Sequence, residues 1–132
     1  MCDGVVKGVY KENNPMYAYK VYDRFKIYRP LADKYTKWRN NLTPYDIQGY
    51  EQLPKKGDLL IITKSMKDVM CLYEMGYTAI SPASESTFLT PDVIDALKLR
   101  FKRIFICFDR DVPGVKNMRK ISLKTGLNGF LV

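Results

Sequence analysis

The second part of the chain alternates short apolar runs with segments in which apolar residues recur at helical spacing. Residues 59–62 form a continuous β-prone apolar run, which is typical of a strand covered on both faces. The next segment begins with Ser65 and Asp68, the S-x-x-D pattern that caps a helix N-terminus. Apolar residues then repeat at helical spacing up to Gly76, a residue that suits the end of a helix. The pattern predicts a strand followed by a helix.

The same alternation of strands and helices continues to the end of the sequence. Two further strands and the beginning of a fourth are predicted at residues 77–81, 103–108 and 129–132. Thr90 followed by Pro91 predicts the start of a second helix, and Gly126 predicts the end of a third. Strands and helices that alternate through short connections indicate an α/β fold with a doubly wound parallel sheet.

The first 57 residues have a different pattern and hold eight of the ten tyrosines. They read as short strands and loops, and the sequence PKKGD at residues 54–58 marks the change to the α/β pattern. We therefore predict a small, basic, tyrosine-rich β subdomain at residues 1–57. An α/β domain is predicted at residues 58–132.

Within the β subdomain, residues 16–30 predict two strands joined by a turn near Asp23 and Arg24. Side chains alternate between the two faces of a strand, so Phe25 and Ile27 fall on an apolar face. The opposite, outer face is basic and aromatic and carries Arg24, Lys26 and Tyr28.

The formal net charge is +8, from 22 Lys and Arg against 14 Asp and Glu. An excess of this size favours a polyanionic partner such as nucleic acid. Cations contact phosphates and aromatic rings stack on bases, and both occur on the outer face of the hairpin and in the loop-like segment after it. The candidate nucleic-acid-binding residues there are Arg24, Lys26, Arg29, Lys37, Trp38 and Arg39. The alternative is an ordinary solvated sheet face, which also carries Lys, Arg and Tyr.

Other features of the composition exclude several kinds of site. The chain has no histidine and three widely spaced cysteines, which excludes a zinc site of usual spacing. Cys71 and Cys107 lie in apolar segments and are predicted to be reduced core residues of a cytoplasmic protein. The longest apolar stretches, residues 59–62 and 104–108, are too short to span a bilayer, so no membrane association is expected.

Polar residues follow each of the first three predicted strands. In a parallel sheet the carboxyl ends of the strands share one rim, where such folds bind ligands. Lys64 follows the first strand, Glu85 lies in the loop after the second, and Asp109 and Asp111 follow the third. Two carboxylates at positions i and i+2 point to the same side and suit Mg²⁺ or Mn²⁺ bound partly through water. The alternative is that Asp111 only caps the helix that begins near Pro113.

These segments resemble a Toprim domain, the catalytic module of bacterial-type primases, topoisomerases and some nucleases. The resemblance lies in residues 59–80, the polar loop and helix after them, and residues 103–114. Its more specific motif is D-x-D after a hydrophobic strand, followed by a turn of small residues. Asp109, Asp111 and Gly114 carry this motif here.

Residues 22–41, a basic strand ending in proline and then a Lys-aromatic-x-Asn stretch, resemble the segment that precedes Toprim in primases. The resemblance covers residues 16–125 and is greatest to primase-like proteins of bacteriophages and related mobile elements. It implies RNA primer synthesis from nucleoside triphosphates on single-stranded DNA, with Mg²⁺ or Mn²⁺ held by Asp109 and Asp111. It also implies a replicative helicase or other replication proteins as partners, and the host cytoplasm as the location of a phage-encoded protein.

Part of the family pattern is missing. After the first strand the family has a glutamate, linked to metal binding or acid-base work, and a glycine, where this chain has Lys64 and Ser65. Lys64 would either contact a phosphate as a point charge or mark the loss of catalysis. Glu85 would either replace the missing acid or be a solvated loop residue. A further acidic motif of the family has no counterpart before Val132, so the chain is expected to be a fragment or a truncated form.

Two other functions stay open on the sequence. A catalytically silent Toprim module would bind nucleic acid through the basic surface and would not depend on Asp109 or Asp111. A Toprim nuclease would cut DNA with a divalent metal, but cleavage has the stronger need for the acid that Lys64 replaces. The leading hypothesis is a primase-type DNA-directed RNA polymerase, in which Lys64 puts catalysis in question.

Overall fold

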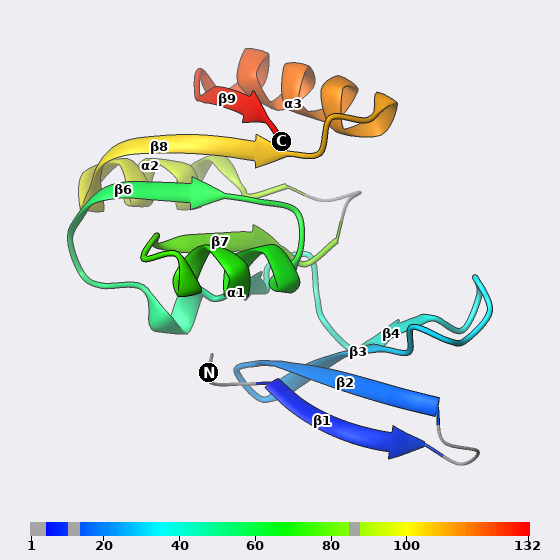
Figure 1. Cartoon of the computed structure of the whole chain (residues 1–132). Helices are drawn as coiled ribbons and strands as arrows, with labels where there is room; N and C mark the ends of the chain where they lie inside the picture. Colours follow the sequence, from blue (N-terminus) through cyan, green and yellow to red (C-terminus); the bar gives the residue numbers. More distant parts are fainter. Residues whose placement is uncertain (1–4, 11–13, 85–87) are drawn as a thin grey trace.

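Two sheets divide the chain in a computed structural model that describes residues 5–10, 14–84 and 88–132 (Figure 1). The first is an antiparallel sheet in the order β1-β2-β3-β4. Its strands are β1 (Val5–Tyr10), β2 (Asn14–Val21), β3 (Arg24–Tyr28) and β4 (Trp38–Asn40). The predicted hairpin at residues 16–30 is confirmed, with the turn between β2 and β3.

The second sheet has the order β5-β7-β6-β8-β9, in which β5 is antiparallel to β7 and the other pairs are parallel. Its strands are β5 (Ile47–Gln48), β6 (Gly57–Ile62), β7 (Ala79–Pro82), β8 (Phe101–Phe108) and β9 (Asn128–Leu131). The helices are α1 (Met66–Glu74), α2 (Pro91–Arg100), α3 (Val112–Thr125) and the short 3-10 helix η2 (Tyr50–Gln52). The prediction of an α/β parallel sheet with a small N-terminal β-rich subdomain is confirmed.

The edge strand β5 was not predicted. Gln48 is fully buried, and its side-chain amide donates hydrogen bonds to the Ser81 hydroxyl (2.8 Å) and the Pro82 carbonyl (2.7 Å) of β7. The second sheet therefore takes in residues that precede the predicted domain boundary between 57 and 58. A strand of two residues is too short to produce a periodic signal in the sequence.

The helix ends lie where the sequence predicted them. The Ser65 side chain accepts a hydrogen bond from the Asp68 amide (3.3 Å) and caps α1. Thr90 precedes α2 but makes no side-chain capping bond. Gly76 and Gly126 follow α1 and α3 with φ angles of 87° and 72°, a conformation that glycine adopts at little cost.

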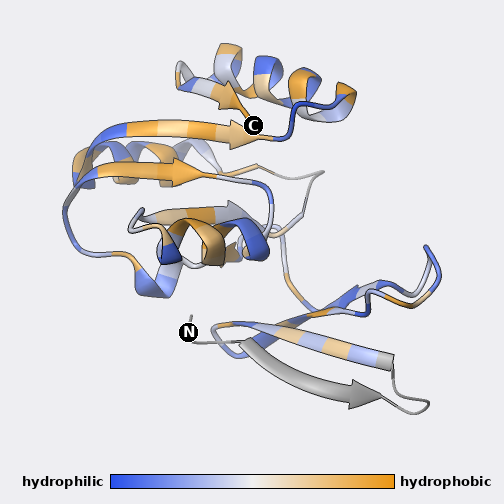
Figure 2. Cartoon of the chain, in the orientation of Figure 1, coloured by the Kyte–Doolittle hydropathy of each residue, from blue (hydrophilic) through white to orange (hydrophobic). Residues whose placement is uncertain are grey.

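Helices cover both faces of the parallel sheet. Figure 1 shows α1 in front of the sheet and α2 behind it, as right-handed crossovers require. Apolar residues are concentrated on β6 and β8 (Figure 2). The core on the α2–α3 face includes Leu60, Ile62, Ile80, Ile94, Leu97 and Ile106. The core on the α1 face includes Ile61, Met66, Val69, Ala79, Cys107 and, from β2, Tyr19.

The prediction that both internal cysteines are core residues is half right. Cys107 is buried on β8, whereas Cys71 is exposed on α1. Cys71 lies in an apolar stretch of sequence, but the helix turns its side chain away from the sheet.

The N-terminal sheet packs against the α1 side, and this reverses the predicted orientation of β3. Tyr19 is only 3% exposed, and Lys67 of α1 places its Nζ 4.4 Å from the centre of the Tyr28 ring. Phe25, on the face predicted to be buried, is 39% exposed. The face that carries Tyr17, Tyr19 and Tyr28 packs against the core on the α1 side, so this face rather than that of Phe25 and Ile27 turns inward.

Across the part of the chain that the structure describes, no helix combines the length and the apolar character needed to cross a bilayer.

Candidate nucleotide and nucleic-acid site

The carboxyl rim of the parallel sheet brings Lys64 and Asp109 together. Neighbouring strands β6 and β8 are paired so that Ile62 lies beside Ile106. Asp109 follows β8 directly, and Lys64 follows β6 after Thr63. The Lys64 ammonium lies 2.5 Å from an Asp109 carboxylate oxygen, and the two side chains are 31% and 47% exposed. An ion pair with this exposure contributes about 0–1 kcal/mol, so a ligand can separate it at small cost.

Asp111 caps helix α3. Its Oδ1 accepts a hydrogen bond from the Gly114 amide (2.7 Å), as the simpler sequence interpretation predicted. A Cβ atom at Gly114 would lie 2.1 Å from the Asp109 carbonyl oxygen, so only glycine fits there. The Asp111 cap and the close contact between Gly114 and the Asp109 carbonyl together fix the backbone after β8. They thereby fix the orientation of both carboxylates.

Asp68 is a third carboxylate near this rim. The sequence pattern had predicted only a role for Asp68 in capping the helix. Burial raises the pKa of the Cys107 thiol, and the charges of Asp68 and Asp109 raise it further. Asp68 lies in the first turn of α1, which follows β6 at the carboxyl rim, and Asp109 follows β8 at the same rim. The position of Asp68 in the first turn of the helix after β6 was the signal that could have identified it.

These residues fit a divalent cation only in part. Within residues 5–10, 14–84 and 88–132, no group of three or more Cys, Asp or Glu side chains is arranged to hold a metal ion. Mg²⁺ is commonly bound by one or two carboxylates, with waters and substrate phosphates as the other ligands. Asp109 and Asp111 therefore fit a Mg²⁺ or Mn²⁺ ion that arrives with nucleotide phosphates. Glu85, the predicted substitute acid, lies outside the described residues.

Lys26 connects the N-terminal sheet to the same rim. Its ammonium donates a hydrogen bond to the carbonyl of Ala83 (3.1 Å), the residue that follows β7. It also lies 4.9 Å from the centre of the Trp38 ring, which stacks on Tyr28 at 4.4 Å. A cation and two stacked aromatic rings thus face the α/β unit close to the rim.

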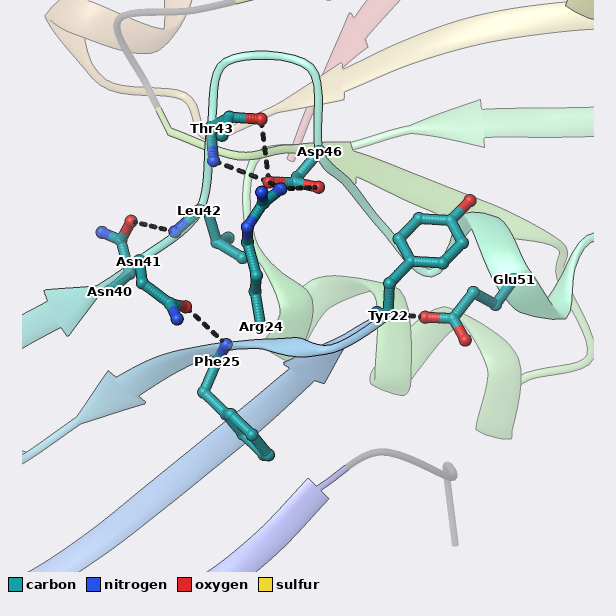
Figure 3. A network of polar contacts seen from close by, with 9 residues as sticks. All are labelled: Tyr22, Arg24, Phe25, Asn40, Asn41, Leu42, Thr43, Asp46 and Glu51. Carbon is teal, nitrogen blue, oxygen red and sulfur yellow. Dashed lines mark hydrogen bonds and ion pairs between the residues drawn. The ribbon is translucent and has the colours of Figure 1, made fainter.

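Arg24 holds the two units together. Its guanidinium forms an ion pair with Asp46 (3.0 Å), whose carboxylate also accepts hydrogen bonds from the Thr43 amide (2.6 Å) and hydroxyl (2.9 Å) (Figure 3). Burial of Asp46 opposes ionisation, but these hydrogen bonds and the Arg24 charge lower the pKa of Asp46 below its usual value. Arg24 is therefore engaged within the protein.

The other predicted nucleic-acid-binding residues lie in different places on the N-terminal sheet. Trp38 and Arg39 lie in β4 rather than in a loop, because they pair with Tyr28 and Ile27 of β3. Arg39 consequently lies on the face opposite to Trp38. Lys37 is half-buried in the turn before β4, and its carbonyl accepts a hydrogen bond from the Arg29 amide (2.8 Å).

Comparison with known proteins identifies the fold. No protein-family model and no curated protein sequence matches the chain. The primase fragment of the bacteriophage T7 primase-helicase matches with a TM-score of 0.71 and 16% identity, over 98% of this chain and 58% of that one. The DnaG primase catalytic domain bound to single-stranded DNA matches with a TM-score of 0.70 and 16% identity, over 98% and 48%.

A further solved structure gives the same result. The E. coli primase catalytic core matches with a TM-score of 0.65 and 17% identity, over 91% of this chain and 44% of that one. The chain thus spans about half the length of these structures. Similarity at this level of identity concerns the fold.

Proposed function

From this primase-like Toprim fold, we propose that the chain carries the core of a DNA primase, which joins ribonucleotides into RNA primers on a single-stranded DNA template. The observation that carries the proposal is the rim, where Lys64 and Asp109 form an ion pair beside Asp111. One similar structure is a primase catalytic domain bound to single-stranded DNA, which supports the same class of substrate. The proposal includes that the protein is encoded by a bacteriophage or a related mobile element.

The residues of the rim have complementary roles. A Mg²⁺ or Mn²⁺ ion bound with a nucleoside triphosphate would neutralise the triphosphate and activate the attacking hydroxyl. Asp109 and Asp111 would hold it, and Lys64, displaced from Asp109, would contact a phosphate oxygen as a point charge. The protein thereby positions the nucleotide and neutralises charge, which supplies most of the catalysis of such transfers.

The template would be bound next to the rim. Cations that follow a DNA backbone and aromatic rings that stack on bases are the usual elements of single-strand binding. Lys26 and Trp38 supply both beside the rim, with Lys37 and Arg29 as further cations. Arg39 lies on the opposite face of β4, so it would contact only DNA that passes round the edge of the sheet. Arg24 would act indirectly, because its pair with Asp46 positions β3.

Other replication proteins are expected partners. A structure similar to this chain contains primase domains that interact with the bacteriophage T7 lagging-strand DNA polymerase. We therefore include a helicase or polymerase among the proposed partners of this chain.

Calorimetric titration of the chain with the preformed Mn²⁺–ATP complex, compared with metal-free ATP in EDTA, tests the metal site. The native chain is expected to bind Mn²⁺–ATP more tightly than metal-free ATP, and Asp111→Asn is expected to lose this difference. Asparagine caps helices as well as aspartate does, so this substitution removes a charged ligand and keeps the start of α3. Asp92→Asn, in the first turn of α2, is the matched control and is expected to bind as the native chain does.

Primer synthesis is the second readout. RNA products from ribonucleotides and single-stranded DNA should form with the native chain and disappear with Asp109→Asn and with Asp111→Asn. An equal gain in ATP affinity from Mn²⁺ in the native chain and in Asp111→Asn would contradict the assignment of the metal ligands.

A catalytically silent nucleic-acid-binding module is the second candidate. The observation that favours it is the Lys64–Asp109 pair, which places an ammonium where the family resemblance implies an acid. This candidate predicts salt-sensitive DNA binding that Lys26→Ala weakens and that Asp109→Asn leaves unchanged. Lys64→Glu separates the two candidates: a silent module would gain Mn²⁺ binding, whereas an active primase that uses Lys64 would lose primer synthesis.

A further inference from the structure

A groove of about 560 Å³ lies between α2 and α3, on the face of the parallel sheet opposite to α1. Small-ligand sites have volumes of roughly 300–1,000 Å³, so the groove is large enough for a nucleotide. Its apolar walls come from Phe88, Leu89, Ile94, Phe108 and Ile121. The two phenylalanines come from different segments of the chain and provide flat surfaces of the kind that pack against an aromatic base.

The charged side chains that line the groove are mostly positive. Among the described residues that line it, four are lysines and one, Asp95, is an acid. The lysines are Lys64, Lys98, Lys120 and Lys124. This excess favours an anionic ligand over a neutral or cationic one.

The lysines are unevenly distributed along the groove. Both helices begin at the carboxyl rim, so Lys64 lies at one end, and Lys98 and Lys124 lie near the C-terminal ends of α2 and α3. Lys120 and Lys124 are four residues apart and share one side of α3. The Lys98 ammonium donates a hydrogen bond to the Thr125 carbonyl (3.3 Å) and so links the two helices at the far end.

We propose that this groove binds a nucleoside phosphate, with its base between the apolar walls and its phosphates on Lys120 and Lys124. The Asn117 amide also lines the groove and can both donate to and accept from a base edge. Neither Asp109 nor Asp111 lines the groove, which meets the rim at Lys64, Ser84 and Gly114. The inference goes beyond primer synthesis and does not require that the chain be an active primase.

Titration of the full chain with ATP in the presence of EDTA tests the site. EDTA removes divalent cations, so binding under these conditions does not depend on Asp109 or Asp111. The native chain is expected to bind ATP saturably, and the methyl NMR signals of Ile94 and Ile121 are expected to shift. The double variant Lys120→Ala/Lys124→Ala is expected to bind about tenfold more weakly or worse, because it loses two charge-assisted contacts.

The matched control is Lys116→Ala. Lys116 is an exposed lysine of the same helix that does not line this groove, so its loss should leave ATP affinity unchanged. If Lys116→Ala weakens binding as much as the double variant does, ATP is held by general surface charge and the proposal fails. If ATP saturates without shifting the Ile94 and Ile121 methyl signals, ATP binds elsewhere and the proposal is again overturned.

A ligand series tests the chemical class. ATP is expected to bind more tightly than tripolyphosphate, which lacks the base, and more tightly than adenosine, which lacks the phosphates. Equal affinity for tripolyphosphate and ATP would show that the apolar walls contribute nothing, and would overturn the assignment to a nucleotide. Binding of a glutamate-rich peptide but not ATP would replace the ligand class altogether.

Discussion

The two faces of the parallel sheet are filled in different ways. On the α2–α3 face the core is mostly aliphatic and is formed largely by the strands and helices of the second half of the chain. On the α1 face, Tyr19 from β2 joins Ile61 and Val69, so two distant stretches of sequence share one core. The first face stabilises the α/β unit by itself, whereas the second couples this unit to the N-terminal sheet. Substitutions on the two faces should therefore have different consequences.

The largest effect is expected on the aliphatic face. Leu97 is fully buried, and Leu97→Ala should lower the free energy of unfolding by about 2–5 kcal/mol, because it removes methyl groups and leaves a cavity. Leu99→Ala, at a position 87% exposed on the same helix, should change it by less than about 0.5 kcal/mol. Urea unfolding followed by circular dichroism measures both. Equal losses would show that α2 does not pack as described.

A smaller effect is expected where the two units meet. Asp46→Ala leaves Arg24 and the Thr43 amide without their partner, and should cost about 1–3 kcal/mol. Asp58→Ala removes only exposed ion pairs with Lys102 and Arg103 (3.6 Å each) and should cost little. The single tryptophan, Trp38, lies in the N-terminal sheet, so its fluorescence follows that unit during urea unfolding. No difference between the two variants would contradict a coupling role for Asp46.

Two substitutions at helix N-caps form a matched pair of variants, for which a smaller loss of unfolding free energy is expected. Ser65 accepts a capping hydrogen bond from Asp68, whereas Thr90 makes none with its side chain. Ser65→Ala should therefore cost about 1 kcal/mol of unfolding free energy, and Thr90→Ala clearly less. Thermal unfolding of both variants gives the comparison, and a larger loss for Thr90→Ala would reverse it.

The last effect is absent near neutral pH and appears only at high pH. Burial, followed by the neighbouring Tyr28 and Tyr17, raises the pKa of Tyr19 to about 12, whereas an unfolded tyrosine ionises near pH 10. The folded state therefore favours the protonated phenol, and this stability is lost as pH rises from about 10 through 12. Unfolding of the native chain should be more sensitive to pH in this window than unfolding of Tyr19→Phe. Tyr45→Phe, at a position 79% exposed, should behave as the native chain.

The contrast between a face built from neighbouring elements and a face shared by distant segments explains which features the sequence could predict. The helices and strands after residue 57 were predicted because Ser65, Gly76, Pro91 and Gly126 carry local signals for helix ends. The orientation of β3 was predicted wrongly because local alternation does not show which face meets another unit. Period-two patterns identify two faces, but the contact with α1 decides which one is buried.

The candidate site shows the same limit. The meeting of Lys64 and Asp109 followed from the rule that parallel strands share one rim, and it needed no knowledge of side-chain contacts. Asp68 was overlooked because its role in the cap already explained its presence. The groove between α2 and α3 was not predicted, since its walls come from segments that are distant in sequence and meet only in the folded chain.

The Lys64–Asp109 pair changes the charge balance of the rim. One positive charge on Lys64 and three negative charges on Asp68, Asp109 and Asp111 leave a formal charge of minus two. The glutamate of the resembling family at the position of Lys64 would make it minus four. Lys64 thus shifts the balance by two units, which is the charge of one divalent ion. A single bound Mg²⁺ would therefore neutralise the rim with Lys64 present, whereas two would be needed with a glutamate there.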